Sequence, residues 1–97
     1  MEGIMSFKVT SVIDGDTFQV SPHWKWKEQT GNIVRPIGYN APENGEEGYA
    51  TAKEKLVSLI LGIEVELVNA VKLSYGRLLC EVQVNGHNLA DFFPEYQ

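Results

Sequence analysis

Apolar and polar residues alternate along several short stretches of the chain, which is the pattern of half-buried strands. The first two stretches, Phe7–Ile13 and Thr17–Val20, flank an Asp-Gly pair, and this arrangement predicts a β-hairpin. The alternation changes phase within the first stretch, which indicates a β-bulge. A third strand is expected over Ile33–Tyr39. Pro36 cannot donate a backbone hydrogen bond there, so it is expected at an edge or at a local break of that strand.

One segment, Glu46–Leu61, has the periodicity of an amphipathic helix. Its apolar residues form a stripe along one face, at Tyr49, Ala52, Leu56, Leu59 and Ile60. Glu46 and Glu47 suit the positive end of a helix dipole, and Gly62 suits the position just after a helix. The pattern therefore predicts one helix after the third strand.

Two further alternating stretches follow the helix, Ile63–Leu67 and Leu78–Val84, and a helical turn is expected over Leu89–Phe93. Three strands, a helix, two strands and a short C-terminal helical turn is the element order of a five-stranded OB-fold barrel. The expected fold class is therefore mainly β, or α+β, with the helix between the third and fourth strands. A four- or five-stranded open α+β sheet is the alternative.

The chain has 97 residues, which fits a single domain over residues 1–97. Cys80 is the only cysteine, so an internal disulfide is excluded, and its parity within the last long strand places it inside the barrel. No apolar stretch approaches the roughly 20 residues of a membrane span, and the N-terminus lacks a secretion signal. We therefore expect a cytoplasmic monomer without a membrane partner, although a secreted protein whose signal has been removed would look the same.

The net charge of −5, from 8 Lys+Arg and 13 Asp+Glu, bears on possible partners. Non-specific nucleic-acid binding normally needs a broad basic face, so this balance weighs against it. Any contact with nucleic acid is therefore expected to be weak, salt-sensitive and confined to a local site.

The first candidate motif is Asp14-Gly15-Asp16-Thr17. One interpretation is a plain hairpin turn, because Asp and Gly tolerate turn conformations. The other is that the tight turn projects two carboxylates side by side, as a hard cation such as Ca²⁺ or Mg²⁺ requires.

The second candidate motif runs from Arg35 to Glu43. A half-buried arginine in a strand needs an anionic partner, which is either Glu43 or Asp16 within the protein or a phosphate from outside. Asn40 and Glu43 flank a proline and can both face the turn at Asp16. A carboxylate beside a bound cation can act as a general base toward water.

Two other segments carry residues suited to nucleic acid. Tyr75-Gly76-Arg77 is either a turn or the source of a second arginine for the phosphate. The segment His23–Lys27 lies between the expected second and third strands and holds Trp24, Lys25, Trp26 and Lys27. Aromatic and basic side chains of this kind bind single strands by stacking and charge. The alternative is that both tryptophans cover the barrel from a long hairpin.

Taken together, Asp14-Gly15-Asp16-Thr17, Arg35 with Ala41-Pro42-Glu43, an amphipathic helix and Tyr75-Gly76-Arg77 resemble the staphylococcal nuclease (thermonuclease-like) family. The order and spacing agree over about residues 7–93. This family has an OB-fold barrel, and its active members are Ca²⁺-dependent nucleases that cleave DNA and RNA. The resemblance therefore implies a hydrolase acting on phosphodiester bonds, with Ca²⁺ as cofactor and single-stranded or frayed DNA or RNA as substrate.

The resemblance also implies roles for particular residues. Asp16, Asn40 and the backbone carbonyl of Ala41 would ligate Ca²⁺, and Asp14 would lie close to the metal beyond its direct ligands. Glu43 would be the general base, Arg35 and Arg77 would bind the scissile phosphate, and Tyr75 would line the nucleotide pocket.

Among the departures from the family pattern, two affect the expected metal site and phosphate site. Asn40 stands where active members carry an aspartate that ligates calcium, so Ca²⁺ binding is expected to be weaker. Pro36 occupies an aliphatic strand position beside Arg35 and can shift it. They motivate a second hypothesis, a catalytically inactive domain that binds nucleic acid or protein. A third is a structural domain in which Arg35 and Glu43 form only an ion pair.

Overall fold

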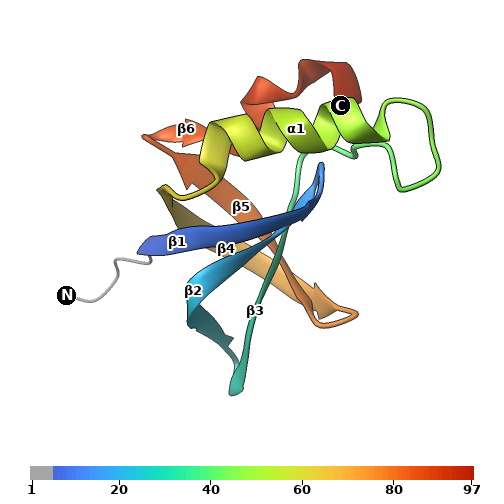
Figure 1. Cartoon of the computed structure of the whole chain (residues 1–97). Helices are drawn as coiled ribbons and strands as arrows, with labels where there is room; N and C mark the ends of the chain where they lie inside the picture. Colours follow the sequence, from blue (N-terminus) through green and yellow to red (C-terminus); the bar gives the residue numbers. More distant parts are fainter. Residues whose placement is uncertain (1–5) are drawn as a thin grey trace.

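The computed structural model describes residues 6–97 of the chain. Its elements follow in the order β1 (Ser6–Asp14), β2 (Thr17–Trp26), β3 (Gln29–Pro36), α1 (Tyr49–Ile60), β4 (Glu64–Ser74), β5 (Arg77–Val84) and β6 (His87–Asn88), then the 3₁₀ turns η1 (Leu89–Phe92) and η2 (Pro94–Tyr96). Figure 1 shows the strands crossing below α1, with the C-terminal turns beside the helix. The predicted helix between the third and fourth strands and the predicted C-terminal helical turn are confirmed.

The strands form one sheet in the order β3-β2-β1-β4-β5-β6, and β3 also pairs in parallel with β5. This extra pairing closes the first five strands into a barrel, so the OB-like architecture is confirmed and the open sheet is not. The register between β1 and β2 shifts between Val9 and Ser11, which confirms the predicted bulge.

The core fills the barrel and the space between the barrel and α1. The helix contributes Ala52, Leu56 and Ile60, all fully buried, as its apolar stripe predicts. Cys80 also points inward and is fully buried, as predicted. Burial raises the pKa of its thiol to about 12, so the thiol stays protonated and unreactive near neutral pH.

The end of the second strand differs from the sequence-based boundary. Residues 23–26 belong to β2 and do not form a long connection, because Trp24, Lys25 and Trp26 pair with residues of β3. The hairpin closes through Lys27 and Glu28, which adopt positive φ angles of 51° and 69°. This tight turn suits the twist of a two-residue hairpin loop.

The start of the helix also differs from the prediction. α1 begins at Tyr49, and Gly48 precedes it with a φ of 89°, a conformation that other residues rarely adopt. Glu46 and Glu47 therefore lie outside the helix, and Glu46 instead accepts a hydrogen bond from the backbone N–H of Glu43 at 2.8 Å. Gly62 follows the helix with a φ of 83°, as its predicted position requires.

The third strand ends at Pro36, earlier than predicted, because proline has no N–H for the ladder. Ile37 still donates to the Cys80 carbonyl at 3.0 Å, and the chain then leaves the sheet. The fourth strand is longer than predicted and continues to Ser74 by pairing with β5.

The C-terminal turns pack against the loop that follows β3. Phe93 is fully buried and stacks on Tyr39 with ring centroids 4.4 Å apart. Lys55 on α1 lies over the Phe93 ring and pairs with Glu95, with 2.9 Å between Nζ and Oε2. These contacts join the C-terminus to the helix and to the loop. Within residues 6–97 no helix has the length and apolarity needed to cross a bilayer.

The Lys55–Glu95 contact predicts a pH dependence of stability. The hydrogen bond from Lys55 lowers the pKa of Glu95 in the folded state. A carboxyl group with a lowered folded pKa stabilises the protein above its unfolded pKa, and this contribution disappears as the pH falls through the folded value. The stability lost in Lys55→Met is therefore expected to shrink on acidification below the normal Glu range. Urea unfolding at stepped pH measures it, and a pH-independent difference would contradict it.

Candidate functional site

The Asp-Gly-Asp turn between β1 and β2 is wedged between two other segments. A Cβ atom on Gly15 would lie 2.7 Å from the Ala52 side chain on α1 and 2.8 Å from that of Ala41. Only glycine lets the turn approach the helix and the loop this closely. The close approach brings Asp16, which is buried, against the loop after β3.

Two hydrogen bonds hold this loop on the turn, and a third holds it to the C-terminal turns. The Ala41 N–H donates to Asp16 Oδ2 at 3.0 Å, and the Tyr39 hydroxyl donates to the Gly15 carbonyl at 2.9 Å. Asn40 donates its backbone N–H to the Tyr96 carbonyl at 2.9 Å. Burial, together with the Asp16 charge, raises the pKa of Tyr39, so its hydroxyl stays a donor.

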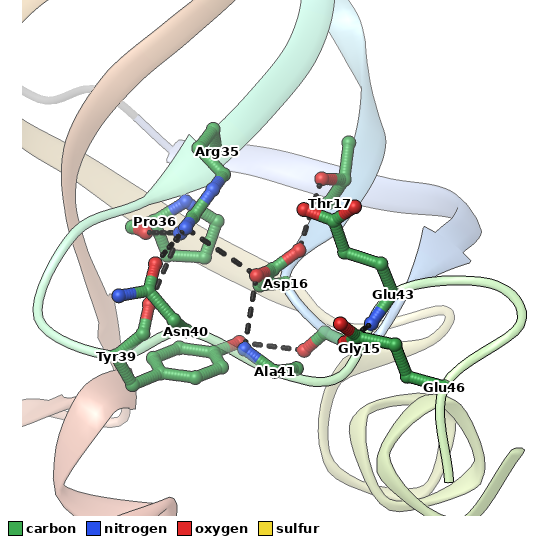
Figure 2. Close-up of polar contacts among 10 residues, drawn as sticks. All are labelled: Gly15, Asp16, Thr17, Arg35, Pro36, Tyr39, Asn40, Ala41, Glu43 and Glu46. Carbon is green, nitrogen blue, oxygen red and sulfur yellow. Dashed lines mark hydrogen bonds and ion pairs between the residues drawn. The ribbon is translucent and has the colours of Figure 1, made fainter. Parts of the chain in front are cut away.

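Arg35 lies at the centre of the site. Its Nη1 donates to the carbonyls of Pro36 at 2.6 Å and Tyr39 at 3.1 Å, and its Nη2 donates to the Asn40 side-chain oxygen and lies 3.4 Å from Asp16 Oδ2. Figure 2 shows the guanidinium, the Asp16 carboxylate and the Asn40 amide directed toward one another. Of the anionic partners considered from the sequence, Asp16 is thus the one that Arg35 meets within the protein.

Asp14 is positioned by the start of α1. The Tyr49 hydroxyl donates to Asp14 Oδ1 at 3.0 Å and contacts the Ile13 carbonyl at 3.3 Å. This hydrogen bond to a carboxylate raises the pKa of Tyr49. The contact fixes one oxygen of Asp14 on the helix side of the turn.

Asp14, Asp16, Arg35, Asn40 and Ala41 line one open cavity of about 850 Å³. Its walls contain every predicted metal-ligand and catalytic residue together with further polar groups: Asp14, Asp16, Arg35, Asn40, Ala41, Glu43, Asn44, Glu46, Arg77, Glu95, Tyr96 and Gln97. The tertiary structure therefore brings together residues from β1, β3, β5, the loop after β3 and the C-terminal turns. Acidic side chains outnumber the two arginines in this wall, which favours a cation inside it.

Glu43 stands on the exposed part of the loop. Its N–H donates to Glu46 Oε1, and its carbonyl accepts from the Glu46 N–H, both at 2.8 Å. These hydrogen bonds use the backbone of Glu43, so its carboxylate takes no part in them. In Figure 2 this carboxylate lies on the side of the loop that faces the turn at Asp16 and Thr17.

Arg77 enters the site from the start of β5. Its Nε donates to the Ser74 carbonyl at 3.2 Å, which holds the guanidinium near the sheet. A second cavity of about 470 Å³ is lined by Arg35, Asn40 and Arg77 as well, together with Leu79 and Tyr96. Tyr75 is 95% exposed and lines neither cavity. Its ring centroid lies 6.0 Å from the guanidinium carbon of Arg77. Its predicted role in a nucleotide pocket stays a prediction.

The tryptophan segment lies elsewhere. Trp24 is 3% exposed and donates from Nε1 to the Ile33 carbonyl at 3.1 Å, so its ring belongs to the core. The prediction that a nucleotide stacks on Trp24 is therefore wrong. The alternative, in which Trp24 covers the barrel, is correct for this residue. Trp26 is half-buried with Lys27 over its ring at 4.9 Å, and Lys25 is exposed. These three residues line other cavities, apart from Arg35 and Arg77.

The structure provides oxygen donors at the positions of the predicted Ca²⁺ ligands. Within residues 6–97 no three His, Cys, Asp or Glu side chains converge as a metal cluster. The predicted set instead combines the carboxylates of Asp14 and Asp16 with the Asn40 amide and a carbonyl. These are the hard oxygen donors that Ca²⁺ takes, so their chemistry fits. Arg35 contacts both Asn40 and Asp16 Oδ2, and ligation by Asn40 would require that contact to open.

Some residues of the site were missed by sequence analysis. Tyr39 and Tyr49 orient the turn, Glu46 holds Glu43, and Tyr96 holds Asn40. The Glu-x-x-Glu spacing in the loop was a local signal for the Glu43–Glu46 contact. The other contacts join residues at least 24 positions apart, and no local pattern reports such pairs.

Comparisons with known proteins add no assignment to this geometry. No protein-family model matches the chain. No curated protein matches it significantly either.

Proposed function

We propose that this protein hydrolyses phosphodiester bonds of single-stranded or frayed nucleic acid in a Ca²⁺-dependent reaction. The observation that carries the proposal is the meeting of Arg35, Arg77, Glu43, Asp14 and Asp16 around one open cavity. Phosphodiester hydrolysis requires groups of these kinds: two guanidinium groups, a carboxylate that can act as a base, and a pair of aspartates for a cation.

Each of these groups has a chemical task in the proposed reaction. Arg35 and Arg77 bind the phosphate and stabilise the negative charge that develops on its oxygens. Glu43 takes a proton from a water molecule while the water oxygen forms a bond to phosphorus. The bond from phosphorus to the leaving sugar oxygen breaks, and that oxygen takes up a proton from solvent. Ca²⁺, held by Asp16, Asn40 and the Ala41 carbonyl with Asp14 nearby, would supply positive charge beside the phosphate.

A binding module without catalysis is the second candidate, and the contact between Arg35 and Asn40 favours it. An amide at position 40 removes one negative charge from the metal site, and its oxygen is occupied by the guanidinium. Such a site can keep its affinity for a phosphate group while losing affinity for the cation.

Cleavage of a labelled single-stranded oligonucleotide across a Ca²⁺ titration distinguishes the two candidates. The enzyme hypothesis predicts cleavage that rises with Ca²⁺ into the millimolar range and disappears with a chelator. The binding hypothesis predicts retention of the oligonucleotide without product at every Ca²⁺ concentration. Absence of both binding and cleavage would overturn the proposed function.

The substitution Asn40→Asp is expected to raise Ca²⁺ affinity by about tenfold, because it adds a full negative charge to a ligand oxygen. Isothermal titration calorimetry measures this directly. Asn44→Asp is the matched control, since it adds the same charge to the same cavity wall at a residue with no predicted metal contact. Equal gains for both variants would show a general charge effect and contradict the ligand role of Asn40.

A further inference from the structure

The outer face of the barrel continues from the phosphate cavity onto β4. Leu78 and Cys80 of β5 point inward and are buried, so Arg77 and Leu79 point outward. In the sheet register Leu79 stands opposite both Arg35 on β3 and Lys72 on β4. Since residues paired across neighbouring strands share a face, Lys72 lies on the same face as the two arginines.

A β-bulge decides where Lys72 stands in this face. Between the pairs Val68–Glu81 and Lys72–Leu79, β4 contains residues 69–71 whereas β5 contains only Cys80. A regular ladder continued from Val68 would place Lys72 opposite Arg77, and like charges in that position repel. The bulge instead places Lys72 opposite Leu79, in the same row across the strands as Arg35, and diagonal to Arg77. The three cations therefore share the face, but no two of them are paired directly across neighbouring strands.

The charge of this face contrasts with that of the whole chain. Three of the eight Lys and Arg residues gather here, although the chain has a net charge of −5. On this outer face Glu81 lies in the row beyond Leu79, and its oxygens accept hydrogen bonds from Asn69 and Gln83. Two further acids, Glu66 and Glu64 of β4, lie farther along the face, opposite Gln83 and Lys8. Lys72 itself is exposed to solvent. A local cluster of cations on an acidic protein favours an extended anionic ligand.

We propose that Lys72 binds the phosphate next to the one held by Arg35 and Arg77, so that a nucleic-acid strand crosses the β3–β5–β4 face. Neighbouring strands lie about 4.8 Å apart, so the backbones at Arg35 and Lys72 are about 10 Å apart across β5. Their side chains are long enough to reach two successive phosphates of one strand. The preferred ligand is then an oligonucleotide and not a mononucleotide. This inference rests on the phosphate site of the proposed function.

Binding measurements with ligands of different length test the path. The parent protein carries Glu43→Gln, so that fluorescein-labelled oligothymidylates survive in millimolar Ca²⁺. Lys72→Ala is expected to weaken oligothymidylate binding about threefold to tenfold, as the loss of one charged phosphate contact does. It is also expected to lower the salt slope of log K by about 0.7. Binding of thymidine 5′-monophosphate, measured by calorimetry, is expected to stay unchanged.

Two further variants complete the design. Lys72→Arg keeps the charge and is expected to restore oligonucleotide affinity. Lys8→Ala removes an exposed lysine from β1, which lies outside the β3–β5–β4 face, and is expected to leave affinity unchanged. Equal affinities for Lys72→Ala and Lys8→Ala, or equal losses for the mononucleotide and the oligonucleotides, would overturn the path.

The outcome for the path is separable from the outcome for catalysis. If the wild-type protein cleaves oligonucleotides while Lys72→Ala binds all ligands like its parent, the path is wrong and the proposed hydrolysis stands. If the wild-type protein never cleaves but the Lys72 effect depends on ligand length, the path stands on a binding module. If the parent binds no oligonucleotide and the wild-type protein neither binds nor cleaves one, both proposals are overturned.

Discussion

Replacing Glu43 with Gln is expected to lower the rate of oligonucleotide cleavage by about 10²–10⁴-fold at saturating Ca²⁺. An amide has nearly the same size as the carboxylate but cannot accept a proton from water. The turn around this residue is held by its backbone contacts with Glu46, so the substitution leaves the loop in place. Single-turnover cleavage of a labelled single strand measures the effect on the chemical step.

Glu47→Gln is the matched control for this substitution. Glu47 is exposed in the same loop, but it does not line the cavity. It is therefore expected to keep the wild-type rate, and both variants are expected to keep wild-type stability within about 0.5 kcal/mol. Cleavage by Glu43→Gln at the wild-type rate would remove Glu43 from the reaction, and an equal loss in both variants would indicate a general charge effect.

Replacing Phe93 with Ala is expected to cost about 3–5 kcal/mol of unfolding free energy, as for other buried aromatic residues. Phe93 is fully buried, stacks on Tyr39 and carries Lys55 over its ring. Its removal leaves a cavity beneath the loop whose Tyr39 hydroxyl reaches Gly15. Because a small domain has only about 5–15 kcal/mol of stability, the loss is a large share of the total. Urea unfolding followed by tryptophan fluorescence measures it.

Phe92→Ala is the control for the Phe93 substitution. Phe92 is the neighbouring aromatic residue, but it is half-buried and packs edge-on against His87 with ring centroids 6.3 Å apart. Its truncation is expected to cost clearly less than that of Phe93. Equal losses, or a loss below about 1 kcal/mol for Phe93→Ala, would mean that the C-terminal turns are not an integral part of the core.

Much of the fold could be predicted from the sequence because it depends on short-range patterns. The Asp-Gly turn, the bulge in β1, the stripe of α1 and the inward position of Cys80 follow from residues close together in the chain. The boundaries were less accurate where pairing extends a strand beyond its alternating residues. Trp24 belongs to β2 because it pairs with Gly31.

The residues of the candidate site could be read from the sequence, but of their contacts only the Arg35–Asp16 pair was among the alternatives considered. The motif at Asp16, Arg35 and Glu43 could be read along the chain, and the structure places all three around one cavity. The Arg35–Asn40 contact was not predicted. Tyr39 and Tyr49 were missed as supports, because their partners are contributed by the first hairpin.

By itself the sequence determined the order of the elements, the turn chemistry and the residue types available for a phosphate and a cation. Hydrophobic periodicity and turn propensity act over a few residues, so they can be read without a structure. The tertiary structure alone decided that β3 and β5 close the barrel, that Trp24 is buried, and that the bulge in β4 places Lys72 in the row of Arg35. Those outcomes depend on the register between strands distant in the chain, which is set by packing of the whole core.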